Sequence, residues 1–297
     1  MSRQAASVNR QAAPASRQAA PASRQAAPAS RPAVPVRRRA APASRRAALL
    51  STRLVARDTW WQEFDCPDIA ATALPGQFVM LGVGLDAPGS WLLPRPFSVG
   101  WTGPGGEVGI LLRAYGQGTR ALAKLETGQT ALLLGPLGRP FDTEGAAVVS
   151  VAGGVGLAPF IFLAAREAAA GRRVRLIYGE RDAGAVFDPA LIARLTDHEP
   201  ELFTEDGSAG RKGLVTAGLD PASNALLLGC GPTPLLRALA AFAREHGRRL
   251  QVSVEEHMGC GIGTCQGCVV RAADGRWVKS CIEGSVFPAE ELDWGAI

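Results

Sequence analysis

Four cysteines near the carboxyl end of the chain have a type and spacing suited to binding iron. Cys260, Cys265 and Cys268 follow the pattern C-x4-C-x2-C, and Cys281 comes after twelve further residues. This pattern matches the spacing with which plant-type proteins hold a 2Fe–2S cluster through four thiolates. Structural zinc, which usually prefers paired C-x2-C knuckles, is a second interpretation, and disulfides are a third.

The residues between these cysteines suit a chain that must wrap tightly around a compact group. Gly259, Gly261, Gly263 and Gly267 permit backbone conformations with positive φ. They also let backbone amides approach the sulfur atoms, where hydrogen bonds tune a redox potential. His257 lies beside the loop, but we expect it to be a spectator because four cysteines already complete the ligand set.

Two earlier motifs could bind the phosphates of a nucleotide. "RPFS" begins at Arg95, and "GQGT" at 116–119 follows an expected strand and opens an expected helix. Backbone amides at the start of a helix bind phosphate well, and an arginine on a facing strand would add a bidentate contact. Arg113, on the strand before "GQGT", is a second candidate for that contact. Each motif taken alone is equally well explained as a turn or a surface charge.

Glycine motifs mark the ends of two expected parallel strands. "GGVG" at 153–156 ends one strand and precedes a helix, and "CGP" at 230–232 occupies the equivalent place later in the chain. A dinucleotide binds at the carboxyl ends of such strands. The candidate contacts to a dinucleotide are therefore Gly153, Gly154, Gly156, Cys230, Gly231 and Pro232. A tight strand–helix turn explains the glycines equally well, and a buried small apolar role explains the lone cysteine.

Short strands punctuated by glycine and proline fill the chain from about residue 51 to residue 142. The strand-like stretches are 75–83, 95–101, 107–115 and 130–138, and the helix candidate is 119–128. This rhythm predicts a small antiparallel β-barrel.

From residue 145 onward, strands and helices alternate. Strand-like stretches at 146–154, 172–180, 224–232 and 249–256 are interleaved with helical patterns at 157–171 and 233–247. Such alternation predicts a doubly wound parallel sheet of the α/β class. The expected organisation is a leader over 1–49, a β-barrel over 50–143, an α/β domain over 144–250 and a cluster segment over 251–297.

The net positive charge of the chain comes from its amino-terminal segment. Residues 1–57 hold 12 arginines and no acidic residue, whereas residues 58–297 have a net charge of −7. "SRQAAPA" repeats at 16–22 and 23–29, and its recurring proline would break a helix. We expect residues 1–49 to be a disordered low-complexity leader, with a transit peptide as the alternative. The acidic remainder does not indicate nucleic-acid binding.

Cysteine usage and hydropathy bear on the compartment. The chain has 6 cysteines and no apolar signal-peptide core at its start, which favours a metal site in the cytoplasm over disulfides. No run of about 18 apolar residues is present, so we expect no membrane span.

Taken in order, the motifs resemble those of a known superfamily. "PGQF", "RPFS", "GQGT", "GPLG", "AGGVGLAP", "YGER" and "CGP" are similar to the ferredoxin reductase-like proteins over roughly residues 52–251. In that superfamily the barrel binds a flavin and the α/β domain binds NAD(P)H. The tail, from "EEHMGCGIGTCQGCVV" through "SCIEGSVFPAEELDW", resembles the electron transfer subunits of dihydroorotate dehydrogenase, which carry FAD and a 2Fe–2S cluster.

The resemblance implies a set of site residues. Contacts to FAD fall on Arg95, Pro96, Phe97, Ser98, Leu111, Leu112, Arg113, Gly118 and Thr119. The cluster ligands fall on Cys260, Cys265, Cys268 and Cys281. Because "GERDAG" at 179–184 offers both Glu180 and Arg181 near the expected ribose site, the choice between NADH and NADPH stays open.

The same resemblance implies an electron relay in pyrimidine biosynthesis. NAD(H) exchanges a hydride with FAD, and electrons pass singly through the cluster. The partner is an FMN-containing catalytic subunit, in a heterotetramer with two copies of each chain. A flavin/iron–sulfur reductase subunit of another complex, serving a ferredoxin, a hydrogenase or a sulfur reductase, is the nearest alternative. A zinc-stabilised binding subunit without enzymatic activity is the alternative from another class.

Overall fold

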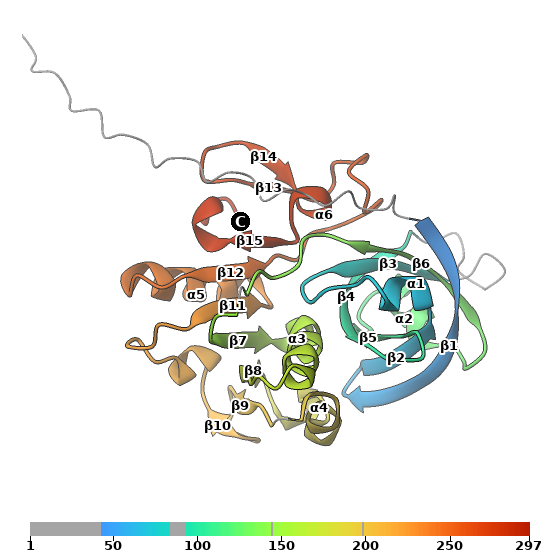
Figure 1. Ribbon diagram of the computed structural model, residues 1–297, viewed down its shortest axis with the longest axis horizontal. Coiled ribbons are helices and arrows are strands. Elements are labelled where there is room, and N and C mark those ends of the chain that lie inside the picture. The colour runs from blue at the N-terminus through green and yellow to red at the C-terminus, as the bar shows by residue number, and fades with distance from the viewer. Residues whose placement is uncertain (1–42, 84–92, 144, 198) are drawn as a thin grey trace, which may run out of the picture. The chain divides into compact units, whose positions relative to one another are not determined.

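The first part of the structure is a closed six-stranded barrel. The computed structural model describes residues 43–83, 93–143, 145–197 and 199–297 (Figure 1). Neighbouring strands of the barrel pair antiparallel in the order β1-β2-β5-β4-β3-β6. The strands are β1 (Ala43–Ala56), β2 (Thr59–Asp65), β3 (Phe78–Val83), β4 (Arg95–Thr102), β5 (Glu107–Arg113) and β6 (Thr130–Leu137), with two short helices, α1 (Pro67–Ala70) and α2 (Gln117–Ala123).

Strand β1 begins earlier than the expected barrel boundary at residue 50. Ala43–Ala48 pair with β6, and the side chains of Ala47 and Leu49 are each only 1% exposed inside the barrel. Burial alternates along this strand, with Ala47 and Leu49 inside the barrel and Arg46 exposed, although the composition continues that of the leader. The remainder of the expected leader, residues 1–42, lies outside the described residues.

The second part is a seven-stranded sheet whose core is parallel. Its strand order is β10-β9-β8-β7-β11-β12-β15. Among the described strands of this sheet, β12 and β15 are the only antiparallel neighbours. The parallel strands are β7 (Val148–Gly153), β8 (Arg175–Glu180), β9 (Glu201–Thr204), β10 (Arg211–Lys212), β11 (Leu226–Cys230) and β12 (Leu250–Ser253). The expected combination of an antiparallel barrel with a parallel α/β sheet is confirmed.

Helices cover both faces of this sheet, as doubly winding requires. One face packs against α3 (Ala158–Ala169) and α4 (Pro189–Thr196), and the other packs against α5 (Thr233–Glu245). In α5 the buried residues recur with helical spacing at Leu236, Leu239, Ala240 and Ala243, which gives the helix one apolar stripe. Figure 1 shows α3 and α4 on one side of the sheet and α5 on the other.

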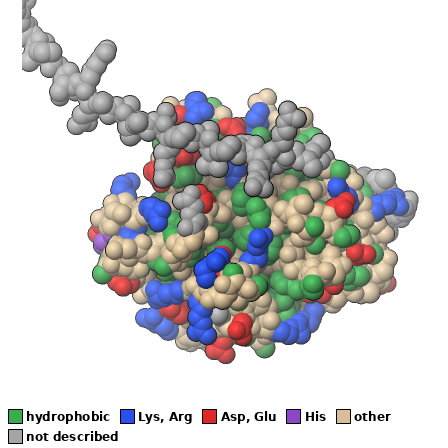
Figure 2. Space-filling view, in the orientation of Figure 1, with side chains coloured by type: hydrophobic (Ala, Val, Ile, Leu, Met, Phe, Trp, Pro, Cys, Tyr) green, Lys and Arg blue, Asp and Glu red, His purple; other side chains and the backbone are tan. Residues whose placement is uncertain are grey.

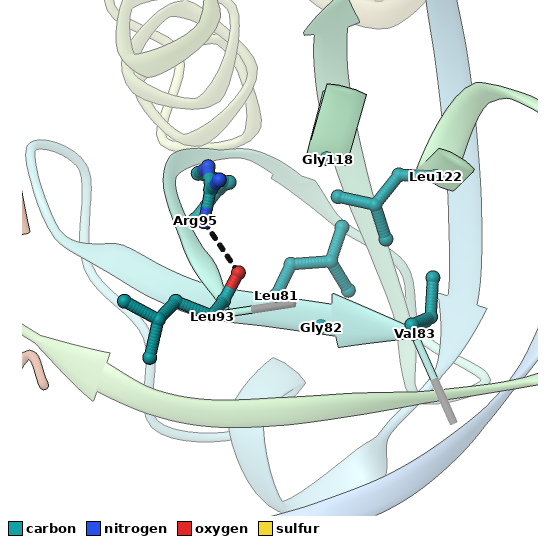
Figure 3. A pocket seen from close by; sticks show the side chains of 7 residues that line it. All are labelled: Leu81, Gly82, Val83, Leu93, Arg95, Gly118 and Leu122. Carbon is teal, nitrogen blue, oxygen red and sulfur yellow. Dashed lines mark hydrogen bonds between the residues drawn. The ribbon is translucent and has the colours of Figure 1, made fainter. Parts of the chain in front are cut away.

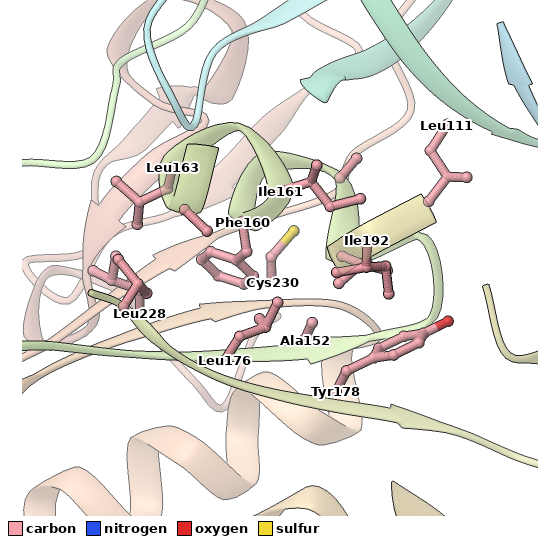
Figure 4. Packing of buried hydrophobic residues seen from close by; sticks show 14 of the residues in the cluster. Leu111, Ala152, Phe160, Ile161, Leu163, Leu176, Tyr178, Ile192, Leu228 and Cys230 are labelled. Atoms are coloured by element: carbon pink, nitrogen blue, oxygen red, sulfur yellow. The ribbon is translucent and has the colours of Figure 1, made fainter. Parts of the chain in front are cut away.

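The barrel and the sheet share one apolar core. Trp61 and Leu111 of the barrel belong to the same buried cluster as residues of α3 and the sheet. Trp61 meets Phe187, which follows β8, edge to face with ring centroids 6.0 Å apart. Figure 4 shows Leu111, Tyr178 and the other labelled side chains of this cluster. A shared core holds the carboxyl edge of the sheet against strand β5.

The carboxyl-terminal segment packs onto both earlier parts. A hairpin of β13 (Val269–Arg271) and β14 (Trp277–Lys279) leads into the short helix α6 (Ser280–Glu283). Strand β15 (Val286–Pro288) then joins the sheet beside β12. The expected cluster segment thus supplies an antiparallel edge strand to the α/β sheet, because the apolar residues Val286 and Phe287 need burial.

The surface of the structured part carries both signs of charge. On the face shown in Figure 2, basic and acidic side chains are interspersed. No helix in the described part of the chain has the length and apolar character needed to span a membrane.

Candidate functional site

Arg95 of strand β4 lies against the turn that opens helix α2. A Cβ atom added to Gly118 would stand 3.2 Å from Arg95 Cζ and 3.2 Å from one terminal nitrogen of the guanidinium. The guanidinium donates to the carbonyl oxygen of Leu93. Figure 3 shows the small pocket that these residues line together with β3, and its lining residues are Leu81, Gly82, Val83, Leu93, Arg95, Gly118 and Leu122. The two phosphate-binding motifs expected from the sequence are therefore neighbours.

The "GQGT" turn is organised by its own threonine. Thr119 Oγ1 accepts hydrogen bonds from the amides of Tyr115 (3.1 Å) and Gly116 (3.0 Å). The Thr119 hydroxyl is also paired with the carbonyl oxygen of Gly116 at 3.1 Å. The side chain of Thr119 thus shapes the turn, and Gly118 leaves room for the arginine above it.

The rest of the "RPFS" motif runs along strand β3. Pro96 is opposite Met80, Phe97 is opposite Val79 and Ser98 is opposite Phe78. All three motif side chains are half-buried. Phe97 packs against the apolar core inside the barrel.

The three residues at 111–113 that were expected to contact FAD lie in different environments. Leu112 is fully buried inside the barrel, and Leu111 is buried in the core shared with the sheet. Arg113 donates to Glu180 of β8 at 2.6 Å and to Thr59 Oγ1 at 3.0 Å. Arg113 is thereby committed to joining the barrel to the sheet, which its place before "GQGT" did not indicate.

Glu180 is almost completely buried and accepts a second hydrogen bond. The hydroxyl of Tyr178 donates to Glu180 Oε1 at 3.1 Å. Burial, together with the neighbouring Glu180 charge, raises the pKa of Tyr178. Both hydrogen bonds reach the same oxygen of Glu180, so Oε1 has two partners within the chain.

The two glycine motifs meet at the carboxyl ends of β7 and β11. A Cβ atom on Gly156 would stand 2.4 Å from the carbonyl oxygen of Cys230, and one on Gly231 would stand 2.9 Å from that of Gly153. Gly154 adopts a φ of 59°, and its Cβ position is 3.5 Å from Arg113. Only glycine lets the two strand ends approach so closely.

"CGP" completes this strand end. Cys230 is buried in the shared core (Figure 4), and burial, with the nearby charge of Glu255, raises the pKa of its thiol. Pro232 precedes the first residue of α5. The thiol of Cys230 is thus buried and neutral beside the glycines.

The four cysteines of the carboxyl-terminal segment gather as two pairs. The amide of Cys265 donates to Cys260 Sγ at 3.4 Å, and Cys268 and Cys281 lie together in one buried cluster. Cys268 and Cys281 are buried, whereas Cys265 is exposed. The second pair packs with Phe78, Met80, Leu137 and Met258.

The environments of the two pairs differ electrostatically. Burial disfavours the Cys260 thiolate, but hydrogen bonds from Thr264 and from the amides of Cys265 and Ile262 outweigh it and lower the pKa to about 6. For Cys281, burial and the adjacent Cys268 raise the pKa to about 12. Cys260 also acts on Cys281 electrostatically, so both pairs share one region.

This donor set fits a two-iron cluster. Within the described residues, no three Cys, His, Asp or Glu side chains form a preassembled metal site. Two adjacent thiol pairs, one of them already receiving a backbone amide, nevertheless offer two thiolates to each of two irons. His257 lies beside these pairs without being needed as a fifth ligand.

Gly261 brings the cysteine loop against the barrel. Its φ is 71°, and an added Cβ would stand 2.5 Å from Met80 Cγ and 2.9 Å from Leu137 Cδ1. Met80 is therefore both the partner of Pro96 in the barrel and a direct neighbour of the cysteine loop. Sequence reasoning missed Met80, because a methionine in an apolar strand carries no signal beyond burial.

Comparison with known proteins identifies the family. Residues 255–293 match the family described as the iron–sulfur cluster binding domain of dihydroorotate dehydrogenase B. The electron transfer subunit of dihydroorotate dehydrogenase B (NAD(+)) from Desulforamulus reducens is 34% identical over 252 residues, which cover 81% of this chain and 95% of that protein. The corresponding subunit from Shouchella clausii is 37% identical over 80% of this chain and 93% of its own length. The chain belongs to this family of electron transfer subunits.

Solved structures of other proteins resemble this fold. The chain in a structure of the NADH-dependent reduced ferredoxin–NADP oxidoreductase has 27% identity and a TM-score of 0.74, covering 84% of this chain and 90% of that one. A cytochrome P450 reductase from Amycolatopsis has 24% identity and a TM-score of 0.55 over 70% of this chain and 68% of its own, which bears on the fold alone. Membership of the ferredoxin reductase-like superfamily, expected from the ordered motifs, is confirmed.

Proposed function

We propose that this chain is the electron relay of an NAD-dependent dihydroorotate dehydrogenase, working between NAD(H) and a catalytic partner subunit. The observation that carries the proposal is the position of Met80, which pairs with Pro96 and contacts Gly261 of the cysteine loop. Adjacent strands lie about 4.8 Å apart. The motif proposed for the flavin and the thiols proposed for the cluster are thus separated by one strand.

FAD is the first cofactor of the proposal. Arg95 would hold its phosphates beside the turn at Gly118 and Thr119, and Pro96, Phe97 and Ser98 would line the flavin along β4. Bound there, FAD would exchange two electrons with a nicotinamide and pass them on singly. Leu111 and Leu112 contribute by shaping strand β5, since their side chains are buried in protein.

The cluster is the second cofactor, with Cys260, Cys265, Cys268 and Cys281 as its ligands. The exposed Cys265 marks the side on which electrons would leave the chain. The neighbouring side chains of Ile262 and Ile282 are also exposed, at 44% and 45%, and supply apolar surface for a partner at this point. We propose that the catalytic subunit docks over this side.

The nicotinamide nucleotide is proposed to bind at the carboxyl ends of β7 and β11. Gly153, Gly156 and Gly231 let the two strand ends meet, and Gly154, whose added Cβ would meet nothing closer than 3.5 Å, leaves space for a ligand to approach the backbone. Glu180, whose Oε1 is held by Arg113 and Tyr178, and the adjacent Arg181 are the proposed contacts to the ribose.

Orotate chemistry is assigned to the partner, an FMN-containing catalytic subunit in a heterotetramer with two copies of each chain. Reducing the pyrimidine double bond needs a pocket for the ring and a proton donor beside the reacting carbon. The cytoplasm is the proposed compartment, since thiols that bind iron must stay reduced.

The test is to purify the chain and assay it alone. We expect bound FAD, iron and acid-labile sulfide, and NADH oxidation with ferricyanide, but no reduction of orotate. Stoichiometric zinc in a colourless protein would contradict the proposal and favour a structural zinc site.

A further inference from the structure

The hydroxyl of Ser280 is buried without a hydrogen-bond partner. Ser280 is 0% exposed, and its Oγ is one of the buried side-chain atoms in the described residues that contact no donor or acceptor. A buried hydroxyl that gives up water without gaining a partner costs free energy. An acceptor that the chain itself does not provide is therefore expected beside it.

Ser280 stands between two of the cysteines assigned to the cluster. Its amide donates to the carbonyl oxygen of Cys268 at 3.0 Å, and Cys281 is the next residue. At the other end of α6, Gly284 donates its amide to the carbonyl oxygen of Ser280 at 3.1 Å. The backbone of Ser280 is thus fixed on both sides, immediately beside the buried thiol pair.

Two other serines show that this position is distinctive. Ser285, five residues further along, donates its hydroxyl to the carbonyl oxygen of Gly76 at 3.0 Å and is satisfied within the chain. Ser150 is also buried without a partner, but it lies in the middle of β7, opposite Leu176 and Leu228. Among these three serines, Ser280 alone has a hydroxyl without a hydrogen-bond partner and also lies next to residues assigned as cluster ligands.

We propose that the Ser280 hydroxyl donates a hydrogen bond to a sulfur of the bound iron–sulfur cluster and raises its reduction potential. The inference rests on the proposed function, because it requires the four cysteines to hold such a cluster. Reduction adds one negative charge to the cluster, so a donor stabilises the reduced form more than the oxidised form. Ser280 is in this sense a positioning and tuning residue and is not a ligand.

The test is redox titration of the holoprotein, followed by the EPR signal of the reduced cluster. Ser280→Ala should lower the midpoint potential by the equivalent of a roughly three- to tenfold shift in the ratio of oxidised to reduced cluster. Tenfold corresponds to about 59 mV for a one-electron couple. Ser280→Thr keeps the donor and should retain a potential close to that of the unmodified protein.

Ser285→Ala and Ser150→Ala are the matched controls. The first removes a satisfied buried hydroxyl from the same segment, and the second removes an unsatisfied one from the sheet, so neither should move the potential. Thermal unfolding of the holoproteins gives a second readout: Ser280→Ala should lower the unfolding temperature and Ser150→Ala should not.

The outcomes separate the two proposals. A cluster that is present in Ser280→Ala with an unchanged potential would overturn the role of Ser280 and leave the relay intact. If Ser280→Ala does not retain the cluster, Ser280→Thr decides. If Ser280→Thr retains the cluster at the potential of the unmodified protein, the hydroxyl is supported as the hydrogen-bond donor. If Ser280→Thr loses the cluster, or holds it at a clearly lowered potential, the donor role is contradicted. Absence of iron and sulfide from the unmodified protein would contradict the proposed function itself.

Discussion

Arg113 of the barrel and Glu180 of the parallel sheet form an ion pair, with 2.6 Å between the guanidinium nitrogen and the carboxylate oxygen. The Glu180 side chain is 5% exposed and the Arg113 side chain is 30% exposed, so water screens the pair only in part. The pair lies beside Gly154, at the end of the first parallel strand. It fixes the barrel to the edge of the sheet where a nicotinamide nucleotide is proposed to bind.

Arg113→Ala should therefore destabilise the protein by about 2 kcal/mol, because it leaves a buried carboxylate without its cation. Chemical denaturation of the holoprotein measures this change. Arg57→Ala is the matched control, since Arg57 also joins the barrel to the sheet through Asp182 but is exposed. We expect no measurable change for the control, and equal losses in both variants would contradict a special role for the buried pair.

Arg95→Ala should weaken FAD retention by about 1.5–3 kcal/mol, roughly tenfold to a hundredfold, if the guanidinium binds a charged phosphate. Flavin occupancy after dilution and desalting measures the effect. The control is Arg120→Ala, which removes an exposed arginine from α2, the short helix whose first turn Arg95 lies against. An Arg95 variant that keeps its flavin as well as the Arg120 variant does would remove Arg95 from the site.

Gly261→Ala should disturb the packing of the cysteine loop on the barrel. The new methyl group would overlap Met80, at an expected cost of about 1–3 kcal/mol beyond the strain of positive φ. Gly275→Ala isolates the strain, because Gly275 has a φ of 85° and an added Cβ meets nothing within 4 Å. We expect loss of cluster absorption in the first variant only. Equal cluster content in both would show that the close contact with Met80 is dispensable.

Deleting residues 2–48 should abolish FAD binding, because the deletion removes all the residues of β1 that pair with β6. Deleting residues 2–42 leaves that pairing in place and should preserve both cofactors. The absorption spectra of the two purified proteins measure the difference. If the protein lacking residues 2–48 still bound FAD, the pairing of Ala43–Ala48 with β6 would not be needed for the FAD site.

The elements that sequence reasoning anticipated are those with strong local patterns. The buried run before Gly153 and the apolar stripe of α5 predict their strand and helix directly, and the spacing from Cys260 to Cys281 predicts a compact four-thiol site. The start of β1 was missed because Ala43–Ala48 contains only alanine, serine and arginine and so has little hydrophobic contrast. Local pattern therefore identified the fold class and the cluster loop.

Contacts between distant segments could not be predicted in the same way. Arg113 was considered as a second candidate for a phosphate contact from its neighbours in the sequence, and its ion pair with Glu180, 67 residues away, was not foreseen. The roles proposed for Met80 and Ser280 likewise depend on the residues that surround them in the folded protein. In each case the deciding quantity is burial or pairing across the fold, which no single motif encodes.

The most direct test of the relay is reconstitution with a dihydroorotate dehydrogenase catalytic subunit, measuring NADH-dependent reduction of orotate. The mixture should show this activity, and replacing the chain by its Cys265→Ser variant should abolish it while FAD remains bound. Cys66→Ala, which removes a buried thiol remote in sequence from the cluster segment, should leave the activity unchanged. Orotate reduction that persists at the unmodified rate with Cys265→Ser would contradict an electron path through the cluster.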